Sequence, residues 1–413
     1  MDKVILHCDL NSFFASASCL NHPELQRVPV AVCGDVKKRH GIILAKNQLA
    51  KRAGVKTAQA VWEAQQTCPG LVMVPPEYQL YMELSETVKH IYERYTGKIE
   101  PFGIDECWLD VTPARITKDY GTQLAHEIRR TIRRETGLTV SVGVSWNKIF
   151  AKLGSDYRKP DAVTVISREN YQKIAWPLPS SELLYVGRAT KKKLDRVGIN
   201  TIGEIATSPE LLLKSLLGKN GLTLHAFANG NDMSPVQPVD HTYGVKGIGN
   251  SMTTKHDLTN DIEVKQAFLI LCEMVAYRAR KKKLQGSVVG IYLRDKDLTH
   301  ITRQVSLPRP TFIADEMVNY AMTLYKANWD AAQRPIRSIG IRIHKLSPIG
   351  KYTQLSFLDP KHIYLQNLEY TKDDINRRFG KQAITRACLL STKVAESNPE
   401  EQHVVHPLSF FRR

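Results

Sequence analysis

Residues 4–16 read VILHCDLNSFFAS, and residues 99–111 read IEPFGIDECWLDV. The first stretch is an apolar strand that ends at Asp9, and the second has the pattern of a β-hairpin with Asp105 and Glu106 at its turn. Because neighbouring strands lie about 5 Å apart, the three carboxylates could meet. Such a cluster repels itself and suits hard cations such as Mg²⁺. Two ions about 4 Å apart can clamp the attacking and leaving oxygens of a phosphoryl transfer. From these acids alone, a strand end and an exposed turn without chemistry remain an open alternative.

Longer blocks surround the acids. Residues 10–16 follow Asp9, and WLDVT at 108–112 follows the hairpin acids. GVSWNKIFAKLGSD at 143–156 comes next, and then KPD at 159–161. In this order and at this separation, the blocks resemble the palm and fingers of Y-family translesion DNA polymerases, in particular the bacterial polymerase IV branch. The resemblance extends over roughly residues 1–390.

The resemblance implies an α+β multidomain fold shaped like a right hand. Its parts are expected to be a palm (1–11 and 76–175), small fingers (12–75), a helix-hairpin-helix thumb (176–233), a linker (234–244), a little finger domain (245–346) and a C-terminal tail (347–413).

Local patterns agree with this division. Strands are expected at 28–33, 138–144 and 162–166 and helices at 81–95 and 120–135, which together suggest a sheet with helices on one face. Later, a long helix is expected at 263–284, with strands at 287–294, 300–307 and 338–344. In the last strand, isoleucines alternate with other residues, so one face should be buried. Thr371 is a possible N-cap for a short helix over 372–379 that ends at Gly380.

The chain is strongly basic. Its 58 Lys and Arg residues outnumber 41 Asp and Glu residues, which gives a formal net charge of +17. Such a surplus favours a polyanionic partner, although a solvated basic surface is the open alternative. Seven cysteines without a Cys-x-x-Cys motif suggest neither a disulfide framework nor a zinc site. No apolar run reaches membrane-spanning length, and we expect a soluble, cytoplasmic monomer that does not bind membranes.

The resemblance also assigns roles to individual residues. Asp9 and Asp105 would bridge two Mg²⁺ ions, Glu106 would hold the ion that activates the primer hydroxyl, and the Leu10 carbonyl would be an additional ligand. The remaining expected nucleotide contacts are the amides of Phe13 and Phe14, the Lys159 ammonium, and Gln48 and Lys51, which stand where relatives carry Tyr and Arg. Phe14 is the expected steric gate against ribonucleotides.

Further residues are expected to meet partners. DNA contacts are predicted at Gly187, Arg188, Lys191 and Lys192 in the thumb and at Arg294, Arg303 and Arg342 in the little finger. Lys148 and Lys152 are assigned either to structure or to DNA phosphates. The peptide with Gln354, Leu355, Phe357 and Leu358 resembles a sliding-clamp motif whose last two apolar residues are exchanged.

The implied function is template-dependent DNA synthesis from dNTPs on primer-template DNA. It would have low fidelity, lesion bypass and no proofreading, in the setting of DNA damage and repair. Two alternatives come from other classes: a non-catalytic DNA-binding relative recruited through its tail, and a nucleotidyl cyclase. Neither would extend a primer.

Overall fold

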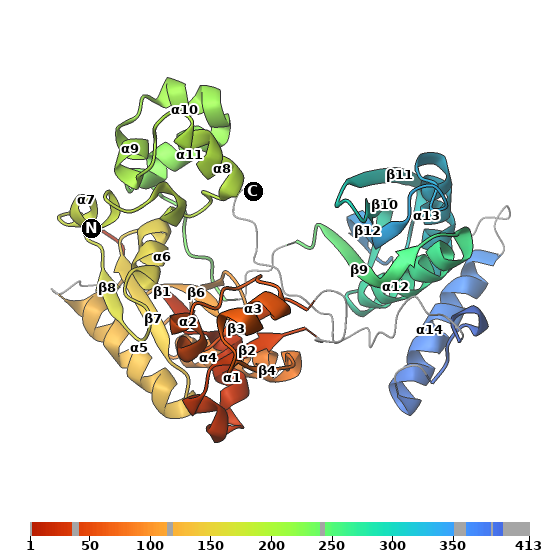
Figure 1. The fold of residues 1–413 in the computed structure, drawn as a ribbon, viewed down its shortest axis with the longest axis horizontal. Helices are drawn as coiled ribbons and strands as arrows, with labels where there is room; N and C mark the ends of the chain where they lie inside the picture. Colours follow the sequence, from red (N-terminus) through yellow and green to blue (C-terminus); the bar gives the residue numbers. More distant parts are fainter. Residues whose placement is uncertain are drawn as a thin grey trace. The chain divides into compact units, whose positions relative to one another are not determined.

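A computed structural model describes residues 2–34, 41–113, 119–239, 244–350, 361–380 and 383–390. The chain forms two compact units, which divide between His241 and Thr242. The division therefore falls inside the expected linker. No helix in the described ranges is long and apolar enough to cross a membrane. Figure 1 shows both units, which are described separately below.

The centre of the first unit is a five-stranded sheet. Its strand order is β5-β6-β1-β7-β8, and β1 is antiparallel to both of its neighbours. The strands span Ile99–Pro101 (β5), Glu106–Asp110 (β6), Ile5–Leu10 (β1), Val140–Ser145 (β7) and Val163–Val165 (β8). The expected hairpin and the strands expected at 138–144 and 162–166 are thus in this sheet, whereas the strand expected at 28–33 (β2, Val30–Cys33) belongs to a separate sheet.

Helices pack on both faces of this sheet, so the expectation of helices on one face only was wrong. Helices α4 (Tyr78–Glu93) and α5 (Tyr120–Thr136) share a hydrophobic core with Leu6, Cys8 and Leu10 of β1. Helix α6 (Lys148–Tyr157) contacts β1 and β7, and its Ala151 is buried with Ile5 on the opposite face. The approach is close, because a Cβ at Gly143 of β7 would overlap the Ala151 carbonyl oxygen. Glycine is therefore required there for α6 to lie on the sheet.

Two smaller parts complete the first unit. The first is a three-stranded sheet of order β3-β2-β4 with the short helices around it. Its elements are α1 (Phe13–Leu20), η1 (Pro23–Arg27), β2 (Val30–Cys33), β3 (Ile43–Lys46), α2 (Gln48–Arg52), α3 (Val61–Thr67) and β4 (Val72–Val74). The second is helical, with α7 (Tyr171–Ala175), η2 (Ser180–Glu182), α8 (Arg188–Asp195), α9 (Ile202–Thr207), α10 (Glu210–Leu217) and α11 (Lys219–Ala228). Thr201 caps α9 with its side chain, and Gly198 has a positive φ of 77°.

The segment from Val236 to Val239 packs beside the five-stranded sheet. Val236 is 3% exposed and lies in a cluster with Ile5 and Trp108. The Gln237 amide donates to Glu100 Oε2 at 3.1 Å, and the Val239 amide donates to the Gly97 carbonyl at 3.0 Å. This segment is therefore attached to the first unit up to residue 239.

The second unit is built on a four-stranded antiparallel sheet of order β11-β10-β12-β9. Its strands are β9 (Gly247–Leu258), β10 (Leu284–Asp295), β11 (His300–Thr311) and β12 (Ile336–Pro348). Helices α12 (Asp261–Lys281) and α13 (Ala314–Asn328) share a core with the buried isoleucines 339, 341 and 343. The alternation in β12 thus has the predicted buried face.

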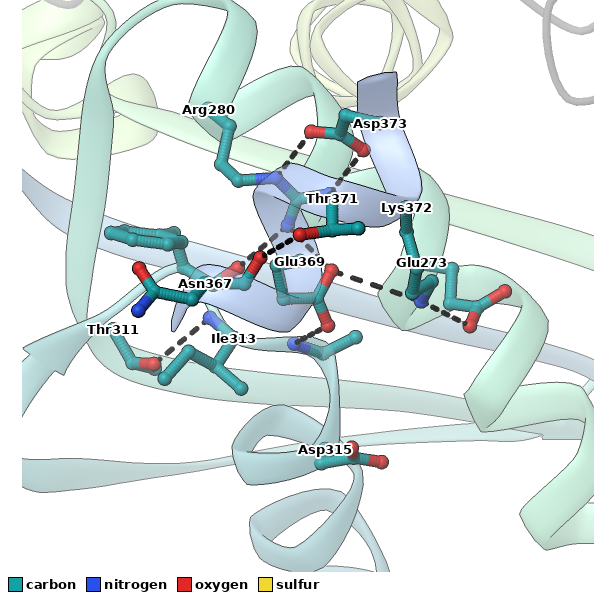
Figure 2. A network of polar contacts seen from close by, with 12 residues as sticks. Glu273, Arg280, Thr311, Ile313, Asp315, Asn367, Glu369, Thr371, Lys372 and Asp373 are labelled. Atoms are coloured by element: carbon teal, nitrogen blue, oxygen red, sulfur yellow. Dashed lines mark hydrogen bonds and ion pairs between the residues drawn. The ribbon is translucent and has the colours of Figure 1, made fainter. Parts of the chain in front are cut away.

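The last described helix, α14, is longer than the sequence suggests. It spans Lys361–Phe379, so Thr371 is an interior residue rather than the N-cap, while Gly380 follows its end with a φ of 98°. Charged contacts attach it to α12 (Figure 2): the Arg280 guanidinium binds both carboxylate oxygens of Asp373, at 2.6 and 2.8 Å, and lies 2.8 Å from Glu369. A short 3-10 helix, η3 (Ala387–Leu389), follows. The sequence did not indicate the full length of α14, because this helix has no stripe of buried apolar residues. Ion pairs such as Arg280–Glu369 attach it instead.

Candidate active site

Strand parity sets the position of the acids. Asp9 pairs directly with Glu106 across β1 and β6, and it shares a face with Ile5 and His7 because side chains alternate along a strand. The amide of Leu10 donates to the Asp105 carbonyl at 3.1 Å, which continues the pairing into the hairpin turn. All three predicted acids therefore lie around the paired ends of β1 and β6.

The pKa of the Asp105 carboxyl reflects its burial and the nearby acids. Burial raises the pKa of its carboxyl, and the negative charges of Glu106 and then Asp9 raise it further, to about 7. A pKa this high means that the site favours the neutral acid unless a cation enters. The electrostatics are those of a site that attracts positive charge.

Two lysines approach the acids from the α6 side. Lys152 Nζ lies 2.9 Å from Glu106 Oε2 and 3.1 Å from Asp9 Oδ2. Lys159 Nζ lies 2.7 Å from Asp9 Oδ2. Both also contact Asp156, at 3.3 Å and 2.7 Å. Burial opposes their charge, but the surrounding carboxylates outweigh it and raise the pKa of each lysine. Both side chains are therefore cations in the site.

His7 lies beneath Glu106. It is fully buried, and its Nδ1 is 2.8 Å from the Ser155 hydroxyl, which itself donates to the Lys152 carbonyl. Nδ1 is therefore the donor to Ser155. Its Nε2 lies 3.5 Å from Glu106 Oε2. Burial, and then the Lys152 charge, hold the pKa of His7 well below its usual range, so the ring is neutral. The sequence reasoning did not single out this residue, although its place two positions before Asp9 puts it on the same face.

Asn11 joins three segments behind the acids. Its amide nitrogen donates to the Ser141 hydroxyl at 2.9 Å, and its carbonyl oxygen accepts from the Asp161 amide at 2.7 Å. Asn11 thus connects β1 to β7 and to the loop that carries Lys159. Asparagine has both a donor and an acceptor here, and a carboxylate would have only acceptors.

The donor set fits a hard divalent cation. Three carboxylates meet, and burial, followed by the charges of Glu106 and Asp9, raises the pKa of Asp105. Oxygen donors of this kind are the usual ligands of Mg²⁺. As the side chains stand, however, no group of three or more His, Cys, Asp or Glu side chains in the described part of the chain encloses a metal position. The lysine ammonium groups contact Asp9 and Glu106 instead.

The predicted nucleotide-binding residues come from α1, α2 and the loop after α6. Phe13 is buried, whereas Phe14 is partly exposed and stacks on Tyr81 with ring centroids 4.3 Å apart. Ser12 precedes α1 without a side-chain cap, so the first amides of the helix have no side-chain partner from it. The Gln48 side chain donates to the Ser12 hydroxyl at 3.2 Å, which brings α2 beside this helix start.

Lys51 is exposed and has a basic neighbour that the sequence reasoning missed. Burial lowers the pKa of Lys46, and the Lys51 charge lowers it further. Lys46 Nζ also donates to the Thr57 hydroxyl at 2.9 Å. Lys46 and Lys51 therefore place two positive charges close together, whereas the sequence predicted only Lys51.

Of the two roles that the sequence left open for Lys148, structure or DNA phosphates, the buried ion pair with Glu100 supports the structural one. The Lys148 side chain is 0% exposed, and Nζ lies 2.7 Å from Glu100 Oε2 and 4.5 Å from the Trp108 ring centre. A fully buried ammonium cannot meet a phosphate. The signal was available in the sequence: Lys148 begins a helix whose residues Ile149, Phe150 and Leu153 are apolar around more than one face.

The predicted DNA-binding residues fall into separate groups. In the helical part of the first unit, Gly187 precedes α8 without a side-chain cap, Arg188 and Lys192 are exposed, and Lys191 pairs with Asp195 at 2.8 Å. In the second unit, Arg342 and Arg294 lie on the sheet face away from the isoleucines. Arg303 pairs with Ile291 in register, so it lies on the other face, where it donates to Asn328 of α13 at 2.9 Å. Gln354, Leu355, Phe357 and Leu358 lie outside the described residues.

Known proteins match nearly the whole chain. The model of the impB/mucB/samB family matches residues 8–156, and that of the family's C-terminal domain matches residues 245–357. DNA polymerase IV of Acetivibrio thermocellus is 46% identical over 395 residues, which are 95% of this chain and 99% of that protein. The chain belongs to the DNA polymerase IV family.

Other relatives have the same name. DNA polymerase IV 2 of Halalkalibacterium halodurans is 38% identical and covers 97% of this chain and 98% of its own length. DNA polymerase IV 1 of Bacillus subtilis is 34% identical, with 96% and 95% covered. A solved Y-family DNA polymerase chimera shares the fold, with a TM-score of 0.73 and 23% identity over 83% of this chain and 98% of that chain. The predicted DNA polymerase IV family and its α+β multidomain fold are thus confirmed.

Proposed function

We propose that this chain is a DNA-directed DNA polymerase of the translesion type. It adds a dNTP to a primer 3′-hydroxyl on a template and releases pyrophosphate. The observation that carries the proposal is the acid cluster at the paired ends of β1 and β6, within a chain that belongs to the DNA polymerase IV family. In such a reaction the protein mainly positions the reactants and neutralises developing charge.

In this proposal the three acids form the metal site. Asp9, Asp105 and Glu106, with the Leu10 carbonyl, would hold two Mg²⁺ ions. Bound there, the ions supply Lewis acidity for the hydroxyl and the phosphate oxygens. The neutral ring of His7 lies behind Glu106, with Nε2 3.5 Å from Glu106 Oε2.

The nucleotide would lie between the palm and the fingers. Lys159 contacts Asp9 at 2.7 Å, so its ammonium is close enough to the acids to meet the triphosphate. The first amides of α1, at Phe13 and Phe14, would bind phosphate oxygens, as helix starts commonly do. Gln48 and Lys51 would approach from α2. The exposed edge of Phe14 would then exclude a ribose 2′-hydroxyl.

Other contacts extend the proposal beyond the acids. The α8 start with Gly187, Arg188, Lys191 and Lys192 would bind DNA phosphates, and Arg294, Arg303 and Arg342 would do so in the second unit. Clamp binding through residues 354–358 stays a prediction from the sequence. We propose the right-hand domain division given above for these parts, with palm, fingers, thumb and little finger.

The test is primer extension with dNTPs and Mg²⁺, in which the wild type is compared with Glu106→Ala and with Glu93→Ala. Glu93 is a partly exposed acid on α4 and is the matched control. We expect extension by the wild type and by Glu93→Ala and none by Glu106→Ala. If no protein extends the primer while all bind primed DNA, the non-catalytic alternative holds instead.

A further inference from the structure

Lys152 occupies a special position among the basic residues near the acids. It comes from α6, its side chain is 13% exposed, and its ammonium contacts three carboxylates within 3.3 Å. Two of these, Asp9 and Glu106, are direct partners across β1 and β6. In the described part of the chain, no other lysine or arginine has a recorded ion pair with both acids.

Its neighbours have different surroundings. Lys159 contacts Asp9 but has no recorded ion pair with Glu106, and it comes from a loop with a more exposed side chain. Lys148 lies one turn earlier on the same helix and is fully buried, but it pairs with Glu100 instead. The two α6 lysines therefore differ mainly in which acids they meet.

We propose that Lys152 is a resident counter-ion of the polymerase site: it holds Asp9 and Glu106 together before divalent ions arrive and moves onto Asp156 when they bind. Asp156 is already 3.3 Å away and is 38% exposed, so it offers a second position for the ammonium. Lys152 is then a positioning residue. The inference rests on the proposed function, because it presupposes that the acids bind divalent cations.

The physical reason is the repulsion between paired carboxylates. Like charges directly opposite each other in an antiparallel pair are destabilising. An ammonium between them removes the repulsion and keeps both side chains pointed at the same place. Lysine suits this task better than arginine, because it is a compact charge on a long stem that can move between partners.

The test compares two methionine variants of the full chain, Lys152→Met and its matched control Lys148→Met. Thermal unfolding is followed in EDTA and during a Ca²⁺ titration without DNA. A ligand that binds the folded state raises the midpoint, so the titration gives an apparent affinity. We expect both variants to unfold earlier than the wild type in EDTA. Only Lys152→Met should gain stability from Ca²⁺ beyond the wild type, with an apparent affinity at least fivefold higher.

A second variant guards against a failure of Lys152→Met to fold. Lys152→Arg keeps the charge but replaces the compact ammonium with a rigid planar group. It should raise the Mg²⁺ concentration for half-maximal primer extension at least threefold. Ca²⁺ gains that are equal in Lys152→Met and Lys148→Met, or an unchanged Mg²⁺ requirement in Lys152→Arg, would overturn the proposal. A wild type that extends no primer would instead overturn the proposed function.

Discussion

The metal-free protein should become more stable when Asp105 is replaced by asparagine, even though the variant loses its activity. The pKa of Asp105 rises from 3.8 in the unfolded chain to about 7 in the folded protein. Folding therefore favours the protonated acid, and the penalty for the charged form begins above pH 3.8 and is complete above about pH 7. At about 1.4 kcal/mol for each pKa unit, this penalty is about 1.5 kcal/mol at pH 5 and about 4 kcal/mol at pH 8. Asparagine has no charge to desolvate and avoids it.

Urea unfolding in EDTA at pH 5 and pH 8 measures this difference for the wild type and Asp105→Asn. The stability gap should be positive at both values and wider at pH 8. Asp110→Asn is the matched control, because Asp110 ends the strand that follows Asp105 and accepts hydrogen bonds from the Thr112 amide and hydroxyl. Its gap should not widen in this way. A gap for Asp105→Asn that is constant with pH, or a less stable variant at pH 8, would refute the electrostatic account of the site.

Three further results are expected. Lys148→Met should lower the free energy of unfolding by about 3–5 kcal/mol in urea titrations, because it leaves the Glu100 carboxylate buried without its cation. Arg280→Met should cost the second unit up to about 3–5 kcal/mol, because Glu369 loses its nearest cation and keeps only the more distant Lys372, at 3.8 Å. Limited proteolysis should then cut within α14, and equal cleavage rates would contradict the role given to this ion pair. Phe14→Ala should raise the ratio of ribonucleotide to deoxyribonucleotide incorporation at least about tenfold, while DNA synthesis is retained. The ring edge would meet only the 2′-hydroxyl, and a tenfold change corresponds to about 1.4 kcal/mol of activation free energy.

Much of the fold could be predicted, because its signals are local. The isoleucine alternation of β12 and the apolar run of β1 each specify a buried face. Thr201 marks a helix start because its side-chain hydroxyl accepts from the Glu204 amide, and Gly198 adopts a positive φ after a helix end. The family resemblance supplied what these patterns lack, namely which elements form one sheet.

The features that could not be predicted depend on contacts between segments that are distant in the sequence. Lys148 and Lys152 are both lysines on α6, four residues apart, and the sequence gives no reason to assign one to Glu100 and the other to the acid cluster. That difference arises from where α6 crosses the sheet, and the crossing depends on Gly143 in another element. The length of α14 was underestimated for a similar reason. Its residue Asp373 binds Arg280, which lies 93 residues earlier in the chain.

The two faces of β1 explain why core and chemistry are linked in this domain. Leu6, Cys8 and Leu10 are buried against α4 and α5, so the alternate residues must face α6. The hydrophobic core thereby fixes the direction of Asp9 without any contact to it. A slip of one residue in the β1–β6 register would exchange the faces and bury Asp9 in the core. The apolar residues of β1 thus determine which face of the sheet carries Asp9, as well as the fold itself. Lys152 on α6 then stabilises the acids on that face.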